Sequence, residues 1–254
     1  MAGPTRSGQR TCFPGAADRG RSGAWPARPA QIAGHRTSRA PLTPYNGRAT
    51  YIHGGGLIRN VVFDIGWVFV HLDHRPFLDF LSAHGADAPD LDSVLARIAL
   101  EDHECGRVDG RGLLERCAAL AQRPMNLDAA HASWVDMFEL QPAMVDLAHR
   151  LSERYRVYLL SNIGDLHWMH LSREYQLHRI GHGALPSFLA GVMKPHEGIY
   201  VEAERRFALT PAETVFIDDR AENIEAAHRR GWHGIVHGGY DATVGALRGL
   251  GVEC

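Results

Sequence analysis

Residues 60–70 form an apolar run that one carboxylate, Asp64, interrupts. A run this short and this rich in Val and Phe is typical of a strand buried on both faces, as in a parallel sheet. An unpaired carboxylate inside such a strand would be costly to bury. We therefore expect Asp64 at the carboxyl end of the strand, facing the crevice where open α/β sheets place their ligands. Gly66 then lets the chain turn sharply; the alternative is a core strand that an aspartate merely caps.

Later stretches of the chain repeat this pattern of an apolar strand followed by polar groups. One such strand leads to Ser161 and Asn162, and another leads to the adjacent Asp218 and Asp219. Neighbouring carboxylates repel one another unless a cation lies beside them. Between the two strands lies Lys194, the only lysine in a chain rich in arginine. Its retention indicates a site that needs a compact ammonium group, with chance as the alternative.

These strand ends, taken in order, resemble the signature of the haloacid dehalogenase-like (HAD-like) hydrolase superfamily. The signature residues here are Asp64, Ser161, Lys194 and the pair Asp218 and Asp219. The segments around them resemble the bacterial α-D-glucose-1-phosphate phosphatase-like subgroup: residues 63–66, 160–162, 193–195, 216–219 and 221–227. The resemblance covers about residues 57–238.

Strand and helix patterns alternate after residue 141. Strands are expected over residues 157–160, 187–190, 214–217 and 233–236, and helices over 142–154, 199–207 and 222–230. Such alternation indicates an α/β fold with a doubly wound (Rossmann-like) parallel sheet. We expect this core to comprise residues 57–72 and 141–254.

Four helical patterns without an intervening strand precede this core segment, over residues 75–84, 91–98, 112–121 and 128–139. They predict an all-helical insert over residues 73–140. In the resembled family such an insert is a small cap that closes over the site and selects the substrate. A helical layer of the core without a gating role is the alternative.

Residues 1–56 have a different composition from the rest. They hold eight Arg, one acidic residue, six Pro and few branched aliphatics, so we expect disorder. The segment partly resembles a transit peptide, but translation from an upstream start, giving a tail without a role, is the favoured interpretation.

The full chain has a formal net charge of -2, which points to neither a nucleic-acid nor a membrane partner. Its cysteines show no CxxC pair and no disulfide framework, so the cytoplasm is the default location. Nothing in the sequence indicates the oligomeric state.

The resemblance implies a hydrolase that removes the phosphoryl group of a small phosphorylated metabolite, such as a sugar phosphate, through an aspartyl phosphate on Asp64. The implied cofactor is Mg²⁺, which prefers hard oxygen ligands. By the family pattern its ligands would be Asp64, the backbone carbonyl of Gly66, and Asp219, with Asp218 acting mainly through water.

The same resemblance assigns roles to other polar residues. Lys194 would neutralise the nucleophile and the phosphoryl oxygens, and Ser161 would hold the transferring group. Asn162 could reach the phosphate or the leaving group. Asn223 either orients the carboxylates or is an ordinary residue on a helix face. Trp67 stands where small or polar residues are usual, so its ring could narrow the pocket, stack on a substrate ring, or pack under the cap.

Gly66 departs from the pattern of most phosphatases in the superfamily. They carry an aspartate there, which serves as general acid and then as general base; the resembled subgroup also has glycine. Another group would have to replace it, and His71 and Asp73 are the nearest in sequence. The departure keeps a non-catalytic binding module open as the alternative function. A metal-free 2-haloacid dehalogenase is disfavoured, because paired acidic residues would repel an anionic substrate.

Overall fold

The computed structural model describes residues 57–254, and the expectation of disorder for residues 1–56 lies outside this range. Five parallel strands form the central sheet in the order β5-β4-β1-β6-β7. Their bounds are β1 (Asn60–Phe63), β4 (Arg156–Ser161), β5 (Gly183–Pro186), β6 (Thr214–Asp218) and β7 (His233–Val236). The predicted α/β class with a parallel sheet is confirmed.

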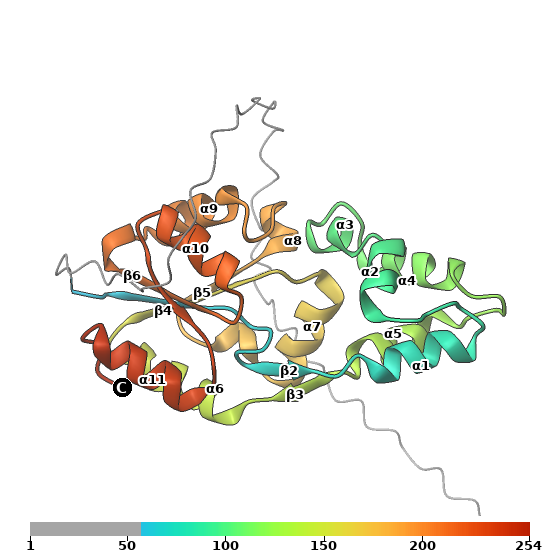
Figure 1. The fold of residues 1–254 in the computed structure, drawn as a ribbon, viewed down its shortest axis with the longest axis horizontal. Coiled ribbons are helices and arrows are strands. Elements are labelled where there is room, and N and C mark those ends of the chain that lie inside the picture. Colours follow the sequence, from blue (N-terminus) through green and yellow to red (C-terminus); the bar gives the residue numbers. More distant parts are fainter. Residues whose placement is uncertain (1–56) are drawn as a thin grey trace, which may run out of the picture. The chain divides into compact units, whose positions relative to one another are not determined.

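Helices cover both faces of this sheet (Figure 1). One face packs against α6 (Pro142–Ser152), α7 (Asp165–Glu174) and α11 (Tyr240–Gly249), and the other against α9 (Glu197–Phe207) and α10 (Ala221–Arg229). Alternate residues of β1 enter opposite cores: Val61 and Phe63 lie in one, and Val62 in the other. This two-residue alternation explains why the strand is apolar on both faces.

The strand register aligns the ends that carry polar residues. Phe63 pairs with Leu159 of β4 on one side and with Ile217 of β6 on the other. The residues that follow Phe63 and Ile217 are therefore level across the sheet, which sets Asp64 beside Asp218. Because all three strands are parallel, their carboxyl ends open at one edge of the sheet.

A helical insert, residues 73–137, leaves the core through a two-stranded antiparallel ribbon. The ribbon consists of β2 (Val70–Leu72) and β3 (Phe138–Leu140). Between them lie α1 (Arg75–Ala83), α2 (Leu91–Arg97), α3 (Leu100–Glu104), α4 (Gly110–Ala119) and α5 (Leu127–Val135). The insert has an apolar cluster of its own, in which the rings of Phe77 and Trp134 meet edge to face at 4.7 Å.

Several predicted elements differ from the observed ones. The strand expected over residues 187–190 is a short helix, α8 (Ser187–Ala190), and the true strand β5 immediately precedes it. The helix expected over residues 128–139 ends at Val135, and its last apolar residue lies in β3. Helices α3, α7 and α11 and the 3-10 turns Leu177–Arg179 and Pro211–Glu213 were not expected. Among the helices of residues 57–254, none has both the length and the apolar character to cross a bilayer.

Candidate active site

Asp64 is the residue that follows β1 at the open edge of the sheet. Its backbone N–H donates to the carbonyl of Ile217 at 2.9 Å, which continues the pairing with β6. Its Oδ1 accepts from the N–H of Ile65 at 2.7 Å. Burial raises the pKa of Asp64 to about 6, although Lys194 pulls in the opposite direction. The carboxylate is therefore held in place at a cost to its charged form.

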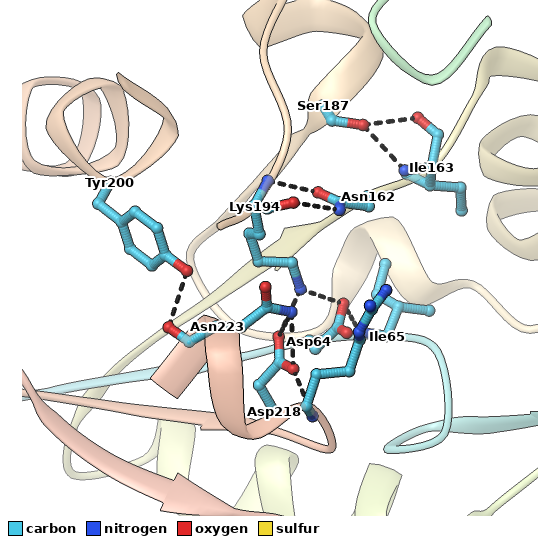
Figure 2. A network of polar contacts seen from close by, with 10 residues as sticks. Asp64, Ile65, Asn162, Ile163, Ser187, Lys194, Tyr200, Asp218 and Asn223 are labelled. Atoms are coloured by element: carbon cyan, nitrogen blue, oxygen red, sulfur yellow. Dashed lines mark hydrogen bonds and ion pairs between the residues drawn. The ribbon is translucent and has the colours of Figure 1, made fainter. Parts of the chain in front are cut away.

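Lys194 lies between two carboxylates (Figure 2). Its Nζ is 2.8 Å from Oδ1 of Asp64 and 2.6 Å from Oδ2 of Asp218, and it lies 5.3 Å from the centre of the Phe216 ring. The side chain is almost fully buried. Burial opposes its charge, but the two aspartates outweigh it and raise the pKa of Lys194. The only lysine of the chain is thus a fixed cation of this site.

Asn162 holds the segment that carries this lysine. Its side-chain oxygen accepts from the backbone N–H of Lys194 at 2.8 Å, and its side-chain nitrogen donates to the Lys194 carbonyl at 2.9 Å. Both ends of the amide that we expected to reach the substrate are therefore engaged with the backbone. Ser161 precedes it as the buried last residue of β4, and a hydrogen bond from Ser161 lowers the pKa of Asp64.

Asp218 is completely buried and is fixed from several directions. Both of its oxygens accept from Nδ2 of Asn223, at 2.9 and 3.0 Å, and Oδ1 also accepts from the N–H of Arg220 at 2.9 Å. The carbonyl of Asn223 in turn accepts from the hydroxyl of Tyr200 at 2.8 Å. Of the two interpretations left open for Asn223, the geometry favours the residue that orients a carboxylate. Tyr200 was missed, because an aromatic residue at helical spacing resembles any core residue.

Three carboxylates converge in a way that suits a divalent cation. One oxygen from each of Asp64, Asp218 and Asp219 lies within 4.8 Å of the others. Burial and the nearby charge of Asp218 raise the pKa of Asp219. Lys194 offsets only one of these negative charges, so the cluster keeps a net negative charge and hard oxygen donors. The donor set therefore fits Mg²⁺.

The turn after Asp64 contains both residues that depart from the family pattern. Gly66 forms an isolated bridge to Val70. Trp67 has a left-handed backbone, with φ of 56°, a conformation that side chains with a Cβ rarely adopt. The Trp67 side chain is 47% exposed and its ring lies 5.3 Å from that of His71. Such strain concentrates near functional sites.

The helical insert meets the site through two residues that sequence reasoning missed. Ser187, fully buried at the start of α8, donates its hydroxyl to the carbonyl of Glu104 at 2.6 Å. The same hydroxyl accepts from the N–H of Ile163 at 2.9 Å, just past the Ser161 strand. Neither contact has a local sequence signal, because each joins segments far apart in the chain.

Comparisons with known proteins agree with this architecture. A family model described as HAD-hydrolase-like matches residues 192–241. A D-ribitol-5-phosphate phosphatase of Bacteroides thetaiotaomicron is 26% identical over 186 residues, which cover 69% of this chain and 90% of the relative.

Two solved structures have a similar fold. One is an aspartate-to-alanine variant of a HAD family enzyme from Bacteroides thetaiotaomicron, in complex with magnesium and inorganic phosphate. It has a TM-score of 0.67 at 20% identity, over 74% of this chain and 98% of that one. The other, a predicted HAD-like family hydrolase from Porphyromonas gingivalis, has a TM-score of 0.65 at 25% identity, over 77% and 98% of the two chains. In its ordered motifs, its parallel sheet and these relatives, the chain is similar to HAD-like hydrolases.

Proposed function

We propose that this chain is a Mg²⁺-dependent phosphatase that hydrolyses a small phosphorylated metabolite through an aspartyl phosphate on Asp64. One observation carries the proposal: a buried carboxylate, a buried ammonium group and a set of cation ligands share one edge of the sheet. A carboxylate can attack phosphorus only where the charge of the phosphate dianion is offset, and this edge provides both means.

The relatives support the substrate class. The curated relative acts, by its name, on ribitol 5-phosphate, and a structural neighbour binds magnesium and inorganic phosphate. We therefore propose a phosphorylated sugar or sugar alcohol as the substrate. The cytoplasm stays the expected location, on the cysteine usage alone.

In the proposed mechanism the carboxylate of Asp64 attacks the phosphorus atom while Lys194 keeps that carboxylate ionised and neutralises the phosphoryl oxygens. Ser161 holds the transferring group. Asn162 positions Lys194 through its backbone rather than contacting the substrate. Mg²⁺, held by Asp64, Asp218, Asp219 and the Gly66 carbonyl, would supply further charge neutralisation at the phosphoryl group.

We further propose that the helical insert is the cap of this enzyme. It is joined to the core by two short strands and packs its own apolar cluster, as expected of a small unit that contributes to substrate selection. In this assignment the core comprises residues 57–72 and 141–254, and the cap comprises residues 73–140, which are the helical insert together with β3.

The proposal is tested by release of inorganic phosphate from a panel of esters, each with Mg²⁺ and with a chelator. The panel contains pentitol and pentose 5-phosphates, hexose 1- and 6-phosphates, and 4-nitrophenyl phosphate. We expect turnover that requires Mg²⁺ and is abolished in Asp64→Asn. Turnover of 2-chloropropionate without metal would instead indicate the dehalogenase, and no turnover of any compound would favour the binding module.

A further inference from the structure

We propose that Glu104, at the end of α3 in the helical insert, is the general acid and base of this phosphatase, in place of the side chain that Gly66 lacks. The inference rests on the proposed function and adds a catalytic residue to it. In this proposal a residue of the insert transfers the proton, and the residues at the sheet edge bind and attack the phosphoryl group.

The groups nearest to Gly66 in sequence are poorly suited to proton transfer. Asp73 is bound by Arg75 through contacts of 2.6 to 3.1 Å, and this partner lowers the pKa of Asp73 to about 2. A carboxyl group with so low a pKa carries no proton to donate near neutral pH. His71 is exposed, and its ring lies against Trp67.

The backbone of the insert brings Glu104 to the site. The carbonyl of Glu104 is bound by the Ser187 hydroxyl, which also binds the turn after Ser161. Glycine allows this close approach: a Cβ on Gly106 would overlap the carbonyl oxygen of Phe188 in α8. The backbone therefore fixes the position of Glu104 without help from its side chain.

The carboxyl group of Glu104 is left available. Within residues 57–254 it makes no hydrogen bond or ion pair, and the residue is only partly exposed. The charged groups that act on it are Asp64, Lys194, Arg220 and Glu101.

Burial, followed by the charge of Asp64, raises the pKa of Glu104 to about 7, while Lys194 and Arg220 lower it by less. Near neutral pH this group can therefore both donate and accept a proton, which is what an acid-base catalyst requires.

Both half-reactions balance with this residue. In the first, a bond forms between Oδ of Asp64 and phosphorus as the bond from phosphorus to the ester oxygen breaks. That oxygen takes the electron pair and receives the proton of Glu104. In the second, water attacks the phosphorus atom and gives a proton to the Glu104 carboxylate. The electron pair of the aspartyl bond returns to Asp64, which releases inorganic phosphate and restores the acid form of Glu104.

The test compares Glu104→Gln with the wild type on two kinds of ester, because Gln keeps the size of the side chain but cannot transfer the proton. For an alkyl phosphate, kcat/KM should fall by roughly 10²–10⁴-fold, the usual contribution of general acid catalysis. For 4-nitrophenyl phosphate, kcat/KM should change by less than about threefold, since nitrophenolate leaves without a proton. Glu115→Gln, on the exposed side of α4 in the same insert, is the matched control and should act like the wild type.

Two further readouts distinguish a catalytic role from a structural one. Loss of the base should slow hydrolysis of the aspartyl phosphate, so Glu104→Gln should release a burst approaching one equivalent of nitrophenolate per enzyme. In the wild type, kcat/KM for the alkyl ester should fall as pH rises through about 7, because the acid form is lost, and this limb should vanish in Glu104→Gln.

An equal loss for both esters, or no loss for either, would overturn the inference while leaving the phosphatase intact. Should the variant not fold, the wild type alone decides. For the wild type, a plot of log kcat/KM against leaving-group pKa should be shallow at pH 6 and steep at pH 8.5. A steep plot at both pH values would exclude Glu104 as the general acid. Failure of the proposed function looks different, because the wild type would then hydrolyse no ester.

Discussion

The sheet edge and the α3 end of the helical insert, where it meets the core, place carboxyl groups in opposite surroundings. At the sheet edge Asp218 is fully buried and binds Lys194, Asn223 and a backbone N–H. At the α3 end of the insert, Glu104 is fixed through its backbone while its carboxyl group has no partner among the described residues. These surroundings determine the chemistry open to each group. Asp218, which is bound on every side, is suited to stabilising charge, whereas the unbound carboxyl group of Glu104 can exchange protons.

The two regions also differ in how they are held. Removing one partner from a buried ion pair leaves an uncompensated charge, which is strongly destabilising, so the sheet-edge network is rigid by necessity. The insert is joined by the β2–β3 ribbon and docks through a few polar contacts, among them the N–H of Gly110 donating to Asp165 at 3.0 Å. A shift of the insert would move Glu104 and leave the charge network unchanged.

The greatest loss of activity is expected where the sheet edge loses its nucleophile. Asp64→Asn should reduce turnover by at least about 10⁴-fold, the scale seen when a covalent nucleophile is removed. The fold should survive, because Lys194 keeps Asp218 as a partner that balances its charge. The pKa of Asp64 is raised when folded, so its charge costs stability as pH rises through about 6, and Asn removes that cost.

Steady-state rates with Mg²⁺ measure the turnover, and thermal unfolding at pH 7 without metal measures the stability. Asp146→Asn, on the exposed face of α6, is the control. Near-normal turnover of Asp64→Asn would show that another group attacks the phosphorus atom.

A smaller effect is expected from the cation ligands. Asp219→Asn should raise the Mg²⁺ concentration for half-maximal activity by roughly 10–100-fold, because a charged hard ligand becomes neutral. The thermal shift that Mg²⁺ gives the wild type should weaken in parallel, which is a readout independent of turnover. An unchanged Mg²⁺ requirement would remove Asp219 from the ligand set.

The sequence was sufficient for the sheet edge, for a physical reason. Asp64, Ser161 and Asp218 each end a short apolar strand, and parallel strands bring their ends together whatever the loops between them do. The position of Lys194 was predicted by its rarity and by the family pattern, not by periodicity. Local sequence patterns were therefore enough to predict which residues meet at this edge, where strand geometry alone brings them together.

The insert and its contacts could not be predicted in the same way. Helix α3 has only five residues and little apolar periodicity, so no pattern marks it. Strand β5 contains Gly and Pro, which are poor strand formers, and exists because it pairs with β4. The segment of α8 was predicted as a strand because it is short and apolar, and no side chain caps its first turn. The approach of Glu104 to the site depends on tertiary contacts between segments far apart in the chain, which no local pattern encodes.

A next test moves the acid from the insert to the sheet edge. A Cβ at Gly66 would meet only Leu72, at 3.8 Å, so the Cβ of an aspartate fits at this position without a clash. Combined with Glu104→Gln, it should recover at least about tenfold of the kcat/KM lost for an alkyl phosphate. Mg²⁺ titration serves as the control for damage to the cation site. No recovery with intact Mg²⁺ binding would mean that a carboxyl group at position 66 cannot reach the leaving group.

The weakest effect is expected where the insert docks on the core. Gly164 has an ordinary φ of −88°, so alanine is not strained there, but its Cβ would overlap the buried ring of His103. His103 precedes Glu104, so a displaced ring should shift the proposed acid. Gly164→Ala should therefore lower kcat/KM for an alkyl phosphate several-fold and spare 4-nitrophenyl phosphate.

A double-mutant cycle isolates this contact. His103→Ala removes the ring and leaves a cavity that costs stability, but it also makes room for a methyl group at position 164. Adding Gly164→Ala to His103→Ala should thus cost little more, whereas the same change in the wild type costs its full several-fold effect. If the two effects simply add, the clash does not transmit to Glu104. The orientation of the insert would then not control proton transfer, and the separate roles of sheet and insert would rest on the position of Glu104 alone.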